Sequence, residues 1–212
     1  MNIATAIELR QLAHEAPPTP AEDGPASKEI VAGYGFWIFL LSDVVMFSAL
    51  FASYAVLVHA TAGGPVREQL FSQVSVAIET ACLLASTYTC GLMSLAVQAR
   101  RRGAFFVAAA VTFALGSAFL GLELHEFADM AARGATPQRS AFLSAFFALV
   151  GCHGLHVAVG LLWLVVMAAQ VAVKDFRASV VRRLHCFSLF WHALDVIWVA
   201  LFSVVYLMGV RA

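Results

Sequence analysis

Long apolar runs alternate with short polar connections along this chain. The segment 141–173 contains no Asp, Glu, Lys or Arg, and it exceeds the roughly 20 apolar residues that a membrane-spanning helix needs. The same criterion predicts five spans, near 33–58, 74–97, 104–127, 141–173 and 184–210. The pattern therefore predicts an all-α integral membrane domain, 33–210, built as a bundle of five transmembrane helices.

Residues 1–32 differ in composition from the rest of the chain. They contain four of the six prolines and several acidic residues, without the basic start and short apolar core of a signal peptide. We expect this segment to be a flexible tail. The other two prolines also lie outside the predicted spans, which favours unbroken helices over the interrupted helices of a transporter.

The distribution of basic residues predicts the orientation of the bundle. The tail, the second loop and the fourth loop together hold nine of the 13 Lys and Arg residues. Because cytoplasmic loops carry an excess of basic residues, we expect the N-terminus to be cytoplasmic and the C-terminus to lie outside, on the periplasmic side.

Composition agrees with a membrane protein and narrows its function. The chain is 61% hydrophobic and 12% charged, and its 13 basic and 13 acidic residues cancel. No net field is left to recruit nucleic acid, so nucleic-acid functions are set aside. The four cysteines lie inside apolar runs without a C-x-x-C pair, which predicts packing roles rather than disulfides or a zinc ribbon.

Ionisable side chains interrupt three of the predicted spans near their middle. Asp43, His153 and Asp195 each lie roughly 15–18 Å from the start of their span, and His156 and His192 are close to them in sequence. Groups at this depth must be paired, hydrogen-bonded or neutralised. They either fix helix packing through interhelical hydrogen bonds or bind lipid headgroups and relay protons, and the two roles are compatible. Shared depth leaves open whether Asp43 meets His192 or Asp195.

The histidines also raise the hypothesis of a metal or haem site. His153 and His156 are spaced i, i+3, and His192 would come from another helix. The chain has no C-x-x-C-H motif, and it has no second matching pair of the kind expected in a multi-haem protein. We therefore expect no metal, no cofactor and no catalytic residue on this chain.

A second acidic group lies nearer the predicted outer surface. Glu79 begins the second span, while Glu123 and Glu126, which share a helix face by their i, i+3 spacing, end the third with Asp129. A solvated helix end explains this grouping. The alternative is a polar opening that admits protons, water or headgroups to the bundle interior, with Arg133 or Arg139 balancing its charge.

Three stretches carry a more specific signal, namely GFWIFLLSD at 35–43, SAFFALVGCHGLHV at 144–157 and FWHALDVIW at 190–198. Together they closely resemble subunit III of the haem-copper oxidases, and the resemblance covers essentially 33–209. The five predicted spans, in place of the seven usual in the cytochrome c oxidase version, are similar to the bo-type ubiquinol oxidase branch. The T-A-G-G-P loop at 61–65 and the V-Y-L-M-G ending at 205–209 also resemble that branch.

The resemblance implies a non-redox accessory subunit of a proton-pumping terminal oxidase in the bacterial cytoplasmic (inner) membrane. In this family, quinol oxidation, oxygen reduction to water, haem and copper belong to the catalytic part of the complex. The implied partners are subunits I and II, a small subunit IV and phospholipids, which subunit III holds in a cleft between helices. The subunit would stabilise the catalytic subunit and support proton uptake.

The resemblance also implies roles for individual residues. Asp43 matches the membrane-buried carboxylate that reacts with carbodiimides in many family members, with aspartate in place of the more familiar glutamate. The other matched positions would have a structural or lipid-contacting role; they are His153, His156, His192, Asp195 and Glu126.

Three alternatives remain at this point. The chain can be subunit III of a cytochrome c oxidase, because other subunits select the electron donor. It can also be an independent haem-binding or metal-binding membrane protein that uses its histidines. A proton-coupled carrier is the third alternative, and the absence of proline-broken spans argues against it.

Overall fold

The computed structural model describes residues 28–61 and 73–207, and this part of the chain is helical apart from short connections. The main helices are α2 (Lys28–Leu57), α4 (Gln73–Gln98), α5 (Arg102–Ala132), α6 (Ala141–Lys174) and α7 (Ala178–Leu201). A 3₁₀ turn, η1 (Pro137–Arg139), precedes α6, and a π-helical segment, η2 (Phe202–Leu207), continues α7. The described residues contain no strand, as the apolar pattern predicts.

All five main helices are long and apolar enough to cross a membrane. The spans are Gly33–Leu57, Val74–Gln98, Arg102–Ala132, Ala141–Lys174 and Ala178–Tyr206. The prediction of an all-α protein with five spans is confirmed, and the chain is a multi-pass membrane protein.

Three helices extend by several residues beyond the spans that hydropathy predicts, whereas α4 and α6 differ by at most one residue at each end. α2 begins at Lys28, so residues 28–32 belong to a helix and not to the expected tail, whereas residues 1–27 lie outside the described part. α5 continues to Ala132 and α7 begins at Ala178, beyond the predicted limits of 127 and 184. The added turns carry charged side chains, which lower hydropathy without interrupting the backbone hydrogen bonds of a helix. The predicted end of the last span, 208–210, also lies outside the described residues.

Contacts divide the chain into residues 1–35 and residues 36–212, with the boundary inside α2. The start of α2 is the described part of the first unit. Every contact discussed below lies within the second unit.

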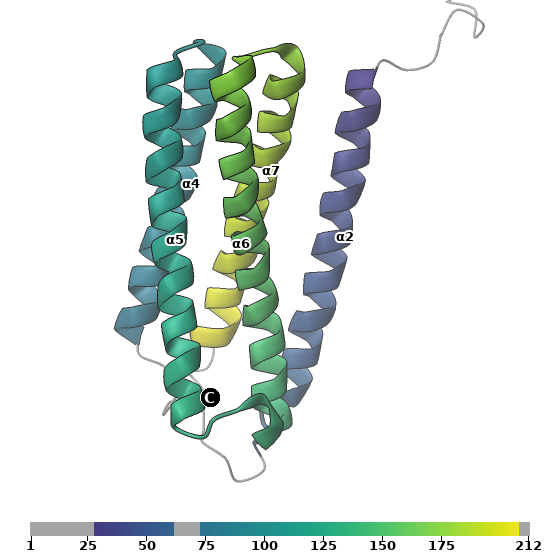
Figure 1. Cartoon of the computed structure of the whole chain (residues 1–212). Coiled ribbons are helices and arrows are strands. Elements are labelled where there is room, and N and C mark those ends of the chain that lie inside the picture. The colour runs from purple at the N-terminus through teal and green to yellow at the C-terminus, as the bar shows by residue number, and fades with distance from the viewer. Residues whose placement is uncertain (1–27, 62–72, 208–212) are drawn as a thin grey trace, which may run out of the picture. The chain divides into compact units, whose positions relative to one another are not determined.

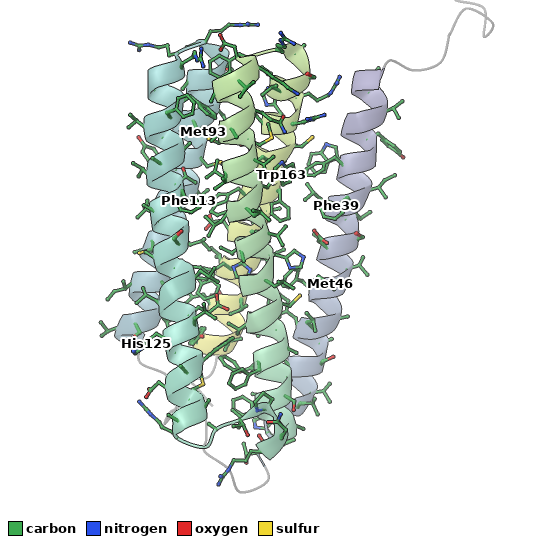
Figure 2. All side chains as sticks on the ribbon, viewed as in Figure 1. Phe39, Met46, Met93, Phe113, His125 and Trp163 are labelled. Carbon is green, nitrogen blue, oxygen red and sulfur yellow. The ribbon has the colours of Figure 1, made fainter. Side chains whose placement is uncertain are left out.

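Within the second unit, α4, α5, α6 and α7 form a bundle in which each helix packs against two others. α4 lies against α5 and α7, and α6 also lies against α5 and α7 (Figure 1). The part of α2 that follows residue 35 reaches the bundle through aromatic side chains. The Phe39 ring stacks on the Phe190 ring of α7, with the ring centroids 6.5 Å apart. Trp163 of α6 points toward α2 (Figure 2), where its ring packs edge-on against the Phe36 ring with the centroids 6.1 Å apart.

Trp191 of α7 fills the centre of the bundle and contacts three other helices. Its indole Nε1 donates a hydrogen bond of 3.1 Å to Ser86 Oγ on α4. A Cβ atom at Gly116 of α5 would lie 3.0 Å from the ring, and one at Gly160 of α6 would lie 2.8 Å from it. The absence of a side chain at these two glycines therefore makes room for the indole.

We expect Gly160→Ala to destabilise the bundle, because the added methyl group would collide with an indole that neighbouring helices hold in place. Overpacking of this kind costs about 1–3 kcal/mol. The measurement is the midpoint of thermal unfolding in mild detergent, with unfolding monitored by tryptophan fluorescence. Gly121→Ala in α5 is the matched control, because a Cβ there meets nothing within 4 Å. Equal midpoints for the two variants would contradict the packing described here.

Candidate functional site

Hydroxyl side chains connect α4 to α5 and α7 inside the bundle. Thr89 Oγ1 lies 2.8 Å from Thr112 Oγ1 of α5, and Ser94 donates to Ser188 Oγ of α7 at 3.1 Å. Hydrocarbon supplies no competing partner, so such bonds fix the rotational setting of the helices. Sequence reasoning missed these residues, although the recurrence of Ser and Thr along α4 was the available signal.

Asp43 of α2 meets His156 of α6. The distance from Asp43 Oδ1 to His156 Nε2 is 3.9 Å, and the two side chains are 14% and 19% exposed. The Phe47 ring, one turn along α2, packs edge-on against the His156 ring with centroids 5.3 Å apart. The polar partner of Asp43 is therefore a histidine of the H-G-L-H segment, and not His192 or Asp195.

The hydrogen bonds of His156 define what its pair with Asp43 can do. His156 Nδ1 lies 2.7 Å from the carbonyl oxygen of Cys152, which can only accept, so Nδ1 carries a hydrogen. Nε2 faces Asp43 Oδ1 at 3.9 Å, beyond direct hydrogen-bond distance, and a shared proton can reside either on the carboxyl group or on Nε2. Both states hold one proton between the two side chains and leave the pair without net charge. Because the pair carries no net charge, it can hold a proton in the hydrocarbon region without the large cost of burying a charged group.

His153 has different surroundings, although it is only three residues away. It is fully buried, and its ring lies 5.2 Å from the Trp198 ring and 5.8 Å from the Phe119 ring. Neither of its ring nitrogens has a hydrogen-bond partner among the described residues. The i, i+3 spacing thus places one histidine against α2 and packs the other into the aromatic core.

The three glutamates of the acidic group come together inside the bundle. Glu79 of α4 and Glu123 and Glu126 of α5 lie within electrostatic reach of one another. Glu79 and Glu123 are 1% and 2% exposed, and the Oε2 atom of each lacks a hydrogen-bond partner in the described part of the chain. Arg133 pairs with Asp129 on its own helix. This burial favours an enclosed carboxyl cluster over a solvated helix end.

The carboxyl cluster is suited to holding protons. Three ionised carboxylates placed together away from water would repel one another and lose their hydration, so proton binding relieves both costs. Tyr206 of η2 lies near all three glutamates and near Tyr54 of α2. Sequence reasoning did not place these two tyrosines at the site. The π-helical form of η2, which contains Tyr206, is a structural signal for them, because such segments are frequent at functional sites.

Gly154 of α6 makes room for the Glu123 carboxylate. A Cβ atom at this position would lie 2.5 Å from Glu123 Oε1 and 2.8 Å from Glu123 Oε2. The carboxylate therefore rests directly on the α6 backbone beside His153. The glycine of the H-G-L-H segment thus has a packing function that the sequence alone does not reveal.

His192 and Asp195 form a third polar group on α7. Asp195 is buried and lies beside His192 and beside Thr87 of α4. His192 Nδ1 donates to the carbonyl oxygen of Ser188 at 2.6 Å. The predicted site residues are therefore distributed over three polar groups plus the separately buried His153.

The structure shows no common coordination set for the histidines. Among residues 28–61 and 73–207, no group of three or more His, Cys, Asp or Glu side chains is arranged to hold a metal ion. His153, His156 and His192 thus remain in three different environments.

Comparison with known proteins places the chain among respiratory oxidase subunits. The family model described as cytochrome c oxidase subunit III matches residues 23–210. Cytochrome bo(3) ubiquinol oxidase subunit 3 of Pseudomonas aeruginosa is 50% identical over 176 residues, which cover 83% of this chain and 84% of that protein. Its counterpart from Buchnera aphidicola subsp. Baizongia pistaciae is 40% identical over 183 residues, with 86% and 93% covered. Quinol oxidase subunit 3 of Bacillus subtilis is 41% identical over 178 residues, with 82% and 86% covered.

We expect Gly154→Ala to destabilise the chain by about 1–3 kcal/mol, because the new methyl group displaces the Glu123 carboxylate. In the double variant Gly154→Ala/Glu123→Ala, most of this cost should be absent, because the carboxylate that the methyl group displaces is no longer there. Residues in contact give such non-additive effects, of about 0.5–3 kcal/mol. Thermal unfolding of the two single variants and the double variant in mild detergent measures the coupling. Gly151→Ala, one turn earlier, is the control, because its Cβ would lie at an ordinary 3.7 Å from Phe127. Strictly additive effects would show that Gly154 and Glu123 are not in contact.

Proposed function

The chain belongs to the cytochrome c oxidase subunit III family, and we propose that it is subunit 3 of a quinol-oxidising haem-copper terminal oxidase. The observation that carries the proposal is the 50% identity with cytochrome bo(3) ubiquinol oxidase subunit 3, which extends over 83% of the chain. A relative named quinol oxidase subunit 3 supports the same branch at 41% identity. Subunit III of the haem-copper oxidases is an accessory subunit and is generally free of cofactors.

The proposed division of labour places the redox chemistry outside this chain. Subunits I and II, together with a small subunit IV, would be its partners in the bacterial cytoplasmic membrane. The catalytic partner would carry the haem and copper, oxidise ubiquinol and reduce oxygen to water. This chain would contribute helix surfaces and buried proton-holding groups to a proton-translocating complex.

Support for a role in proton uptake and complex stability comes from the Asp43–His156 pair. It lies inside the predicted hydrocarbon region, holds one proton in either of its neutral states and joins α2 to α6. The remaining links of α2 to the bundle include aromatic contacts such as Phe39–Phe190. Loss of the polar pair would therefore loosen α2 and the phospholipid that the subunit is proposed to hold.

The proposal predicts which activity co-purifies with the chain. A tagged copy isolated from its native membrane in mild detergent should bring haem bands in a reduced-minus-oxidised spectrum, together with ubiquinol oxidase activity. The same chain expressed alone should show no haem band. Oxidation of reduced cytochrome c without ubiquinol oxidation would identify the cytochrome c oxidase alternative. Haem in the lone chain would identify an independent haem protein and overturn the proposal.

We expect Asp43→Asn to leave assembly and the initial turnover rate of the complex unchanged, because the asparagine keeps the size of the side chain. Activity should decay several-fold faster during sustained turnover, because the amide cannot exchange a proton with His156. The measurement is oxygen consumption over many turnovers, with bound phospholipid quantified in parallel. Ser42→Ala is the control, because Ser42 is the neighbouring α2 residue and bonds only to the Phe39 carbonyl oxygen in the described structure. If the activity of Asp43→Asn decayed at the same rate as that of the wild type, the Asp43 carboxylate would have no role in sustained turnover.

A further inference from the structure

A pocket open to the surface lies where the connection between α4 and α5 meets the connection between α6 and α7. Arg100 lines it from the first connection, and Lys174, Asp175 and Arg177 line it from the second. Phe176, also in its lining, is buried and packs edge-on against the Phe105 ring at 5.8 Å. The pocket is therefore built on an anchored backbone rather than on an exposed loop tip.

The backbone at this pocket is unusual. Arg100 and Asp175 have φ angles of 53° and 56°, and they are the two non-glycine residues with positive φ in the described part of the chain. Arg100 ends α4 in a Schellman motif, with Arg100 N bonded to the Val97 oxygen and Arg101 N bonded to the Ala96 oxygen.

α5 ends in the same motif, but there Gly134, with φ of 77°, occupies the position that Arg100 occupies in α4. Glycine is the residue that this backbone conformation favours. An arginine at position 100 therefore carries backbone strain that a glycine would avoid, and such strained positions are often found at functional sites.

The charges around the pocket are unevenly compensated. Asp175 Oδ1 accepts from Phe176 N at 2.9 Å and lies 3.7 Å from Arg102 Nε, so its charge is already engaged. Arg100 Nη1 donates to the neutral Phe176 carbonyl oxygen at 3.1 Å, and its other guanidinium donors have no partner in the part of the chain that the structure describes. The side chains of Lys174 and Arg177 are exposed and have no ion-pair or hydrogen-bond partner among the described residues. Three cationic side chains thus line a pocket that contains one carboxylate, that of Asp175, and Arg102, which does not line the pocket, balances the charge of that carboxylate.

The location of the pocket indicates the chemistry of its ligand. The two connections end four membrane-spanning helices, so the pocket lies at the level of a membrane surface. Val173 adjoins it with an exposed apolar side chain, 83% of which is accessible. A ligand with a phosphate next to an acyl chain matches this combination, because guanidinium groups bind phosphate oxygens and apolar side chains contact acyl chains.

We propose that the pocket formed by Arg100, Lys174 and Arg177 binds the phosphate group of an anionic phospholipid. The guanidinium groups of Arg100 and Arg177 donate to the phosphate oxygens, and the Lys174 ammonium adds a point charge. The acyl chains pass Val173 into the bilayer. This inference rests on the proposed function and deepens it, because it names a site and a headgroup class for a phospholipid bound to the subunit.

The test uses the intact complex in nanodiscs of phosphatidylcholine with a minority of phosphatidylglycerol. Phosphatidylglycerol retained after release from the nanodisc is measured by native mass spectrometry. The wild type should retain it in preference to phosphatidylcholine, and Arg177→Gln and Lys174→Gln should each reduce retention about fivefold. Arg100→Gly should also lose retention while remaining folded, because glycine suits the backbone at that position.

Arg101→Gln is the matched control, because Arg101 lies in the same connection but does not line the pocket. If Arg101→Gln reduced the retention of phosphatidylglycerol as much as Arg177→Gln does, the attraction would be a diffuse effect of positive charge, and the proposal would be overturned. Displacement of the lipid by inorganic phosphate at equal concentration would assign the pocket to a free anion and overturn the lipid assignment. Haem content and quinol oxidase activity are recorded in the same preparations, so failure of the lipid site is distinguishable from failure of the oxidase assignment.

Discussion

Hydrocarbon offers no hydrogen-bond partner, so each polar atom within the spans depends on a partner elsewhere in the protein. The structure meets this constraint in part, with bonds between helices and with bonds back to the preceding turn, whereas the His153 ring and one oxygen each of Glu79 and Glu123 have no partner among the described residues. Thr89 bonds to Thr112, the Trp191 indole bonds to Ser86, and His156 and His192 each bond to a carbonyl oxygen one turn earlier. The two bonds that join different helices, Thr89–Thr112 and Trp191–Ser86, restrict the rotation of α4 relative to α5 and α7, and the acidic side chains of α4 and α5 lie near one another in that arrangement.

Two kinds of helix contact follow from this arrangement. α4, α5, α6 and α7 approach closely because glycines at 116, 154 and 160 let Trp191 and the Glu123 carboxylate rest on neighbouring backbones. The second unit's part of α2 contacts the bundle through larger side chains, which include Phe39 and the Asp43–His156 pair. The described chain therefore combines a close-packed four-helix bundle with a more loosely linked helix.

The polar groups share a chemical property that fits a membrane complex handling protons. The Asp43–His156 pair can hold a proton without net charge, and burial makes it costly for all three side chains of the carboxyl cluster to be ionised together. Neither group requires a redox centre on this chain. Membership in the cytochrome c oxidase subunit III family places the chain in a multi-subunit oxidase complex.

The sequence by itself determined the fold class, the five spans and the family, because membrane insertion depends on local apolar length and the family motifs are contiguous. It also identified the ionisable residues, since Asp43, His156 and Glu123 stand out within apolar runs. The helix ends were less predictable, because charged terminal turns such as that at Ala178 remain helical after hydropathy has fallen. Only the tertiary structure decided that Asp43 meets His156, that Glu79 meets Glu123 and that Gly154 supports the cluster. These contacts depend on how each helix is rotated and which helices are neighbours, and packing of the whole bundle decides both.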